Sequence, residues 1–173
     1  MFIRIKKIKG LEYAYLVKSV WKEQTARQKV VKYLGKIHQV QKINQSSFQE
    51  FCEKEKKNIK EAKEIIQSLM EWTLYQHGFV KDQLLQTKWI YEHGKIVGNP
   101  ETFELTSGQK EVTLKINQGH MNSFSLQELS KIELSAKTEE QRKAATILAK
   151  AFVAAGIEVP QETFIDIFQQ IYK

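Results

Sequence analysis

The chain has 173 residues, of which 42% are hydrophobic and 27% are charged, and its net charge is +7. This length suits one medium domain or two small ones, and the composition is globular rather than disordered. No apolar run reaches the roughly 18 residues that a membrane-spanning helix needs, so we expect no membrane segment. The single cysteine, Cys52, allows no internal disulfide, and we expect a reducing, cytoplasmic compartment.

The positive charge is concentrated at the N-terminus. Residues 1–43 hold eleven basic and two acidic residues, a net charge of +9. The other 130 residues hold sixteen basic and eighteen acidic residues, a net charge of −2. This asymmetry favours a polyanion as the partner of residues 1–43. The alternative is a solvated, lysine-rich surface that keeps edge strands from aggregating.

Residues 1–43 predict a three-stranded antiparallel β-meander. A strand over 2–8 is followed by the turn signal Lys9-Gly10, and a strand over 11–21 alternates with period two. A third strand over 27–34 ends at Gly35, where the backbone needs a conformation that glycine adopts at low cost. The odd positions of the second strand form one face, which holds Leu11, Tyr13, Tyr15, Val17, Ser19 and Trp21.

The aromatic residues of this meander have two interpretations. One face of such a sheet must be buried, so we expect most of the odd-numbered aromatics to form the core side. If they are exposed instead, they could stack on bases. In either case the cations of Arg4, Lys6, Arg27 and Lys29 would neutralise phosphates and release counterions.

A long helix is predicted after the meander. Ser47 and Glu50 have the spacing of a capping box, and an approximate heptad pattern runs to about Gln76, with Glu55 as a polar interruption. We expect this helix to cover the meander, and the alternative is that it pairs with its own copy in a dimer.

The remaining residues predict a second small sheet and a helical cluster. Alternating apolar positions over 102–105 and 111–116 indicate two antiparallel strands, and the last third reads as three helices. The predicted class is α+β: a basic meander over 1–43, a long helix over 44–78, a small β region over 79–119 and helices over 120–173.

We find no catalytic or metal-ligating pattern. The four histidines, His38, His77, His93 and His120, are scattered, and Cys52 lies on the apolar side of a predicted helix. No phosphate-binding glycine loop occurs, and there are only two aspartates. The sequence therefore predicts no enzyme, no metal and no cofactor.

The N-terminal residues resemble a known family. Phe2-Ile3-Arg4, the Tyr-rich stretch Tyr13–Ser19 and the run Arg27-Gln28-Lys29-Val30-Val31 ending in Tyr33-Leu34-Gly35 resemble the N-terminal segment of DDE-type insertion-sequence transposases, over residues 2–36. The resemblance implies that this segment holds DNA, with contacts from Arg4, Arg27, Gln28 and Lys29. The family's longer catalytic domain needs spaced acidic residues, so we do not expect its transposition activity here.

Two functions remain as hypotheses. The first is a non-catalytic nucleic-acid-binding protein, with DNA favoured over RNA and a homodimer possible. Its predicted binding residues are Arg4, Lys6, Arg27, Gln28, Lys29 and Lys32. The second is a protein-interaction module that acts through the long helix and the C-terminal helices without nucleic acid.

Overall fold

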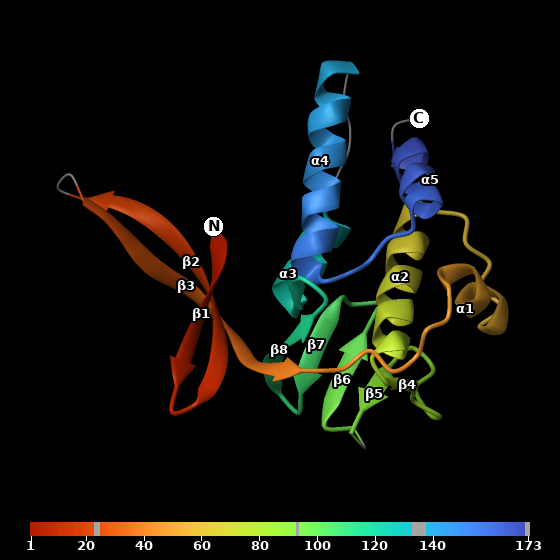
Figure 1. Ribbon diagram of the computed structural model, residues 1–173, viewed down its shortest axis with the longest axis horizontal. Helices are drawn as coiled ribbons and strands as arrows, with labels where there is room; N and C mark the ends of the chain where they lie inside the picture. The colour runs from red at the N-terminus through yellow and green to blue at the C-terminus, as the bar shows by residue number, and fades with distance from the viewer. Residues whose placement is uncertain (23–24, 93, 133–137, 172–173) are drawn as a thin grey trace.

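The computed structural model describes residues 1–22, 25–92, 94–132 and 138–171 (Figure 1). His93 lies outside these ranges. Within them the chain forms five helices and one mixed sheet of nine strands, so the predicted α+β class is confirmed. No helix in the described ranges is long and apolar enough to cross a bilayer.

Three strands form the N-terminal part of the sheet: β1 (Phe2–Ile8), β2 (Leu11–Lys22) and β3 (Thr25–Gln39). They pair antiparallel and in chain order. Gly10 forms the β1–β2 turn with a positive φ of 80°, which a glycine adopts without the steric cost of a Cβ. The β2–β3 hairpin is long and extends away from the rest of the molecule (Figure 1).

The remaining strands belong to the same sheet. They are β4 (Val80–Lys81), β5 (Trp89–Tyr91), β6 (Ile96–Asn99), β7 (Glu104–Ser107), β8 (Lys110–Ile116) and β9 (Gly119–Met121). The strand order is β1-β2-β3-β8-β7-β6-β5-β4, with β9 paired to β8. Residues Lys36–Gln39 of β3 pair parallel with Val112–Lys115 of β8. The prediction of a separate second sheet is therefore wrong, because β3 continues from the meander into the body.

The predicted long helix is also wrong, because it is two helices. α1 (Phe48–Lys54) ends at the C-cap residue Glu55, and α2 (Ala62–Gln76) begins after an irregular segment in which Lys56 has a φ of +49°. Two ion pairs accompany the break: Glu55 binds Lys81, and Lys57 binds Glu71. The capping box of Ser47 and Glu50 is present as expected.

The C-terminal helices are α3 (Ser123–Ser130), α4 (Thr138–Ala155) and α5 (Gln161–Ile171). Asn122 caps α3, since its side chain accepts a hydrogen bond from the backbone N–H of Ser125. At the end of α4 Gly156 has a φ of +71°, and its backbone packs against the Ile116 carbonyl. This close approach leaves no room for a side chain.

The described residues form two hydrophobic cores. The larger joins α1–α5 to β5–β9 and includes Leu69, Trp89, Leu114 and Phe152. The smaller lies under the meander and contains Ala14, Leu16, Leu34 and Ile37, with Ile3, Ile5 and Phe124 packed against it. Phe124 belongs to α3, so the helical residue that covers the meander comes from the C-terminal cluster. The predicted cover by residues 44–78 is therefore wrong.

Candidate nucleic-acid interface

The outer end of the β2–β3 hairpin is a two-stranded ribbon, here called the arm, formed by residues 18–22 and 25–29. The first residue of β1, Phe2, pairs with Val17. From Lys18 onward β2 therefore pairs only with β3. Five residues per strand give the arm a length of about 16 Å. All the arm side chains that the structure describes are exposed. An isolated two-stranded ribbon of this kind has no core of its own and is only marginally stable in water.

Strand register assigns the arm residues to two faces. Lys18 lies directly opposite Lys29, and Val20 lies opposite Arg27. Directly opposed residues share a face, so Lys18, Arg27 and Lys29 lie together on what we call the basic face. Two like charges placed directly opposite each other destabilise a strand pair. In β2 and β3 the one acidic residue is Glu12, which lies at the base opposite Lys7, far along the strand from this pair.

The other side of the meander carries a cluster of aromatic rings, here called the tyrosine face. The Tyr15 and Tyr33 ring centroids are 5.3 Å apart, and those of Tyr13 and Tyr33 are 6.4 Å apart. The Lys6 ammonium lies 4.9 Å from the centroid of the Tyr15 ring, within the range of a cation–π contact. Burial raises the pKa of Tyr33, and the neighbouring Tyr15 and Tyr13 add to this, so its hydroxyl stays protonated at neutral pH.

Arg4 crosses this face. Its Nη1 donates a hydrogen bond of 2.5 Å to Oε1 of Gln28. Arg4 belongs to β1 and Gln28 to β3, so the side chains bridge over β2, which lies between these strands. Both residues are exposed. The contact holds a guanidinium over the tyrosine face, with donors left over for a ligand because Arg has five N–H groups.

The burial of β2 is the reverse of what we expected. The even positions Ala14 and Leu16 are buried in the smaller core, whereas Trp21 on the odd face is 76% exposed. Tyr33, which lies opposite Tyr15, is 46% exposed. Val17 is the exception on the odd face, since it is buried. The prediction that most of the odd-face aromatics form the core side is therefore wrong.

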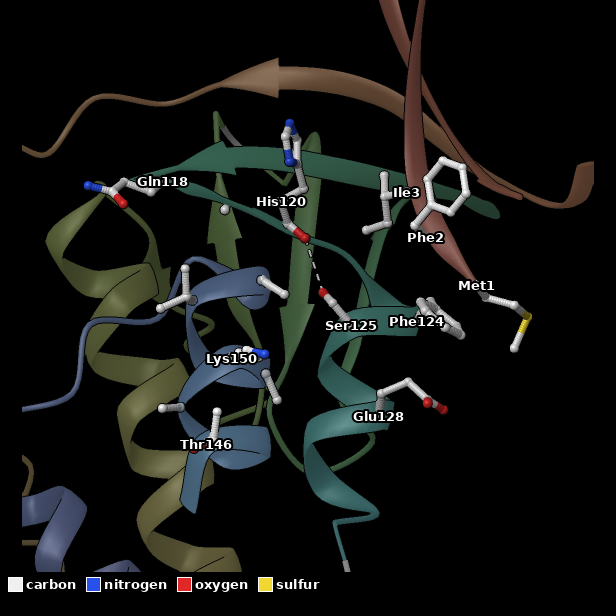
Figure 2. Close-up of a pocket in the computed structure, with 15 residues that line it drawn as sticks. Met1, Phe2, Ile3, Gln118, His120, Phe124, Ser125, Glu128, Thr146 and Lys150 are labelled. Atoms are coloured by element: carbon white, nitrogen blue, oxygen red, sulfur yellow. Dashed lines mark hydrogen bonds between the residues drawn. The ribbon is translucent and has the colours of Figure 1, made fainter. Parts of the chain in front are cut away.

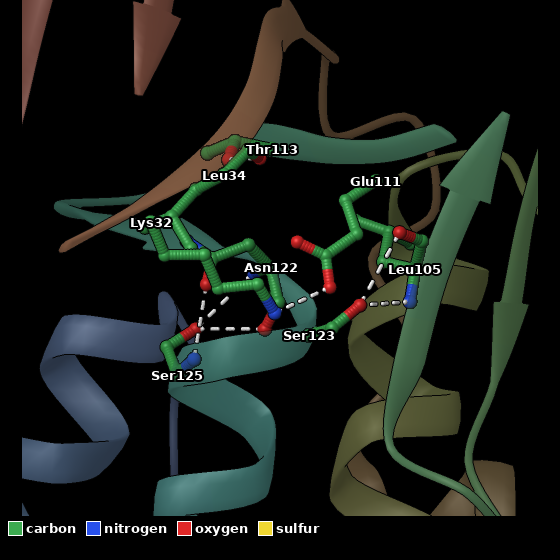
Figure 3. Close-up of polar contacts among 8 residues, drawn as sticks. All are labelled: Lys32, Leu34, Leu105, Glu111, Thr113, Asn122, Ser123 and Ser125. Atoms are coloured by element: carbon green, nitrogen blue, oxygen red, sulfur yellow. Dashed lines mark hydrogen bonds and ion pairs between the residues drawn. The ribbon is translucent and has the colours of Figure 1, made fainter. Parts of the chain in front are cut away.

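The arm is anchored to the body where β3 meets β8 (Figure 3). Lys32 Nζ lies 2.7 Å from Oε1 of Glu111, and the Thr113 hydroxyl donates a 2.8 Å hydrogen bond to the Leu34 carbonyl. Gly35 has a φ of +96°, and a Cβ at this position would lie 2.1 Å from the Glu111 carbonyl oxygen. Only glycine fits this crossing, where the backbones of β3 and β8 nearly touch.

The six predicted binding residues do not form one cluster. Arg4, Lys6 and Gln28 lie on the tyrosine face, and Arg27 and Lys29 lie on the basic face of the arm. Lys32 is paired with Glu111 and belongs to the anchor. Sequence reasoning missed two cations: Lys18, opposite Lys29, and Lys36, opposite Tyr13. Both were part of the N-terminal charge excess, but their positions depend on a register that the sequence does not reveal.

A separate cavity of about 900 Å³ lies between the start of β1 and the helices α3 and α4. Met1, Phe2 and Ile3 line one side, and Phe124 and Glu128 of α3 face them, with Lys150 of α4 nearby (Figure 2). The walls are mainly apolar. The Ser125 Oγ lies 3.1 Å from the carbonyl oxygens of both His120 and Asn122, which can accept its single hydrogen, so this hydroxyl already has protein partners.

The cysteine and the histidines that the structure describes show no catalytic arrangement. Burial raises the pKa of the Cys52 thiol, which disfavours the thiolate that a nucleophile requires. Burial lowers the pKa of His38, His77 and His120. In the part of the chain that the structure describes, no group of three or more His, Cys, Asp or Glu side chains could hold a metal ion.

No protein-family model, curated protein or solved structure matches the chain. Its function must therefore be inferred from its own residues. The meander offers two chemically distinct surfaces, one of exposed cations and one that combines aromatic rings with cations.

Proposed function

We propose that the chain is a non-catalytic, cytoplasmic nucleic-acid-binding protein with a transposase-like N-terminal meander, and that it contacts the phosphate backbone through the arm. DNA is favoured over RNA because the resemblance over residues 2–36 is to a DNA-holding segment. The body, residues 44–173, would hold and orient this module. In this proposal the arm binds nucleic acid and the body anchors the arm.

The opposition of Lys18 and Lys29 is the observation that supports this proposal most strongly. Two ammonium groups on directly opposed residues repel each other, and Arg27 adds a third cation on the same face. The repulsion costs stability in the free protein. A row of phosphates would neutralise these cations and so remove the repulsion. Each phosphate neutralised by Lys or Arg also releases condensed counterions, which favours binding. Folding alone gives no reason for this pairing.

Charge variants of the arm and of Arg4 on β1 test the proposal. The triple variant Arg4→Ala, Arg27→Ala, Lys29→Ala should lose at least about tenfold in affinity for a DNA oligonucleotide at moderate salt, since phosphate contacts supply most of such binding. The matched control removes three exposed lysines of the body: Lys60→Ala, Lys63→Ala, Lys131→Ala. The control should bind like the natural chain. Equal affinities for the two triple variants would contradict the proposal.

A second candidate function is assembly through the C-terminal helices, and the cavity beside α3 and α4 is the observation that favours it. Its apolar lining includes the exposed side chains of Met1, Phe2 and Val153. Sedimentation of the full chain at micromolar concentration tests this function. A dimer that Val153→Asp converts to a monomer would support it, and a monomeric natural chain would contradict it.

A further inference from the structure

We infer that the tyrosine face binds unpaired nucleotides, so that the meander takes single-stranded nucleic acid in preference to duplex. This inference rests on the proposed function and adds its substrate class. Four aromatic residues, Tyr13, Tyr15, Tyr33 and Trp21, share the face by register. Duplex DNA hides its base faces in the stack, whereas single strands present them to aromatic side chains.

Exposure of the rings is the first reason. Trp21 is 76% exposed and Tyr33 is 46% exposed, although large aromatic side chains usually contribute to cores. Val30 lies between them on the same face and is also exposed. An apolar surface that folding leaves uncovered is expected to be covered by a partner. Bases are partners of this kind, because each presents an apolar π-face.

The placement of cations among the rings is the second reason. Arg4 is held over the face by Gln28, Lys6 lies over Tyr15, and Lys36 lies opposite Tyr13. Stacking surfaces for single strands combine aromatic rings with a positive groove that follows the backbone. A protein-binding apolar patch would not need this density of positive charge, so the face matches nucleic acid better than a protein partner.

The length of the face is the third reason. Tyr15 and Trp21 are six residues apart on β2, which corresponds to about 20 Å along the strand. The ring cluster lies at one end, Trp21 lies near the other, and the Arg4–Gln28 pair joins the strands between them. A flexible single strand can follow this twisted surface with several bases, whereas a rigid duplex would touch only part of it.

The basic face and the tyrosine face therefore contribute differently to binding. The basic face of the arm holds cations without rings and serves phosphates of any strand. The tyrosine face supplies the stacking that separates unpaired from paired bases. Affinity for both forms should therefore depend on Arg27 and Lys29, whereas the preference for single strands should depend on Tyr33 and Trp21.

Intrinsic tryptophan fluorescence reports directly on ligand stacking at the tyrosine face. The chain has three tryptophans. Trp72 and Trp89 are 6% and 2% exposed, so a ligand that stacks on the meander should change the emission of Trp21 selectively. A homothymidine strand of about 16 nucleotides should quench this emission in the full-length chain, and Trp21→Phe should lose the quenching while keeping most of the affinity. A homouridine strand of the same length separates DNA from RNA.

The affinities of the natural chain and its variants for single strands and for duplex decide the inference. Tyr33→Ala and Trp21→Ala should each weaken single-strand binding about 5- to 100-fold and change binding of a duplex of equal length by no more than about twofold. Tyr33→Phe keeps the ring and should restore the affinity. Leu84→Ala removes an apolar side chain that is 92% exposed and lies outside the meander, and it should have little effect. Circular dichroism of each variant confirms that the sheet is intact.

Three outcomes separate this inference from the proposed function. Tighter binding of a single strand, DNA or RNA, than of the duplex supports the inference. Equal or tighter binding of the duplex, or equal losses for both forms in Tyr33→Ala, overturns it and leaves the proposed function standing. Failure of the chain to bind either form overturns both.

Discussion

Lys18 and Lys29 lie directly opposite each other across the exposed arm, on the same face as Arg27. A sequence selected for stability alone would place an opposite charge at one of these positions, because opposed unlike charges stabilise a strand pair. This opposition of like charges destabilises the arm locally, and the polyanion that we propose as its partner would relieve the repulsion. Stability and binding should respond in opposite directions to changes at this pair.

Reversing one charge of the pair tests this relation. Lys18→Glu should stabilise the free arm by about 0.2–1 kcal/mol, since it replaces a repulsion by an attraction. Hydrogen exchange of the arm amides should slow about 1.5- to 5-fold, while the affinity for nucleic acid falls. Lys63→Glu on α2 is the control and should leave both arm exchange and binding unchanged. Faster exchange or tighter binding in Lys18→Glu would refute the relation.

Gly35 should be intolerant of any side chain. A Cβ there would lie 2.1 Å from the Glu111 carbonyl oxygen, in a backbone whose φ is already +96°. Gly35→Ala should lower the free energy of unfolding by on the order of 3 kcal/mol, from the backbone strain and the clash together.

Gly10→Ala is the matched control for the Gly35 variant. Its φ is +80°, but nothing lies within 4 Å of an added Cβ, so only the backbone term of about 1–2 kcal/mol applies. Urea denaturation of both variants measures the difference. Equal destabilisation would mean that the close approach of β3 to β8 is not a constraint.

The ion pair between Lys57 and Glu71 should stabilise the break between α1 and α2. Lys57 Nζ lies 2.6 Å from Oε1 of Glu71, and their side chains are 22% and 11% exposed. Lys57→Met should cost about 2–3 kcal/mol, because it leaves a mostly buried carboxylate without its cation. Lys95→Met breaks an exposed pair with Glu92 and should cost less than about 0.5 kcal/mol. Urea denaturation of both variants measures these changes in the free energy of unfolding.

His77 should make stability fall in acid. Burial lowers its pKa below the ordinary 6.5, and Nδ1 lies 2.8 Å from the Thr73 carbonyl oxygen. A lowered folded-state pKa means that the unfolded chain binds more protons, so stability present above pH 6.5 is lost as the pH falls below that value. Each such histidine contributes a slope of up to about 1.4 kcal/mol per pH unit.

His77→Gln should therefore reduce the pH dependence of unfolding between about pH 6.5 and 5. His38 and His120 also have lowered pKa values, so part of the slope should remain. Unfolding in urea at a series of pH values gives the slope. An unchanged slope in His77→Gln would show that this histidine titrates alike in the folded and unfolded chains.

The sequence predicted the local elements of the meander better than their environment. Turn signals and alternation place the strands close to where they lie, and the charge count identified residues 1–43 as the basic surface. The buried face could not be predicted. Both faces of β2 hold apolar residues, and Ala14 and Leu16 are buried because Ile37 and Phe124, distant in the chain, pack against them.

Long-range pairing explains the other differences. The parallel pairing of β3 with β8 joins residues about 75 positions apart, and no local sequence pattern predicts it. The helix break at Glu55–Glu61 contains neither Gly nor Pro, and the partners of its ion pairs, Lys81 and Glu71, lie elsewhere in the chain. The opposition of Lys18 and Lys29 likewise requires the register of the hairpin.

Salt dependence of binding by the full chain is the measurement that tests nucleic-acid binding most directly. If the cations of the two faces, Arg4, Lys6, Lys18, Arg27, Lys29 and Lys36, contact phosphates, log K should fall with log salt with a slope of about −3 to −5. Between about 50 and 200 mM salt this is a loss of roughly two to three decades. Measurable binding that does not weaken with salt, or no binding at low salt, would contradict the proposed function.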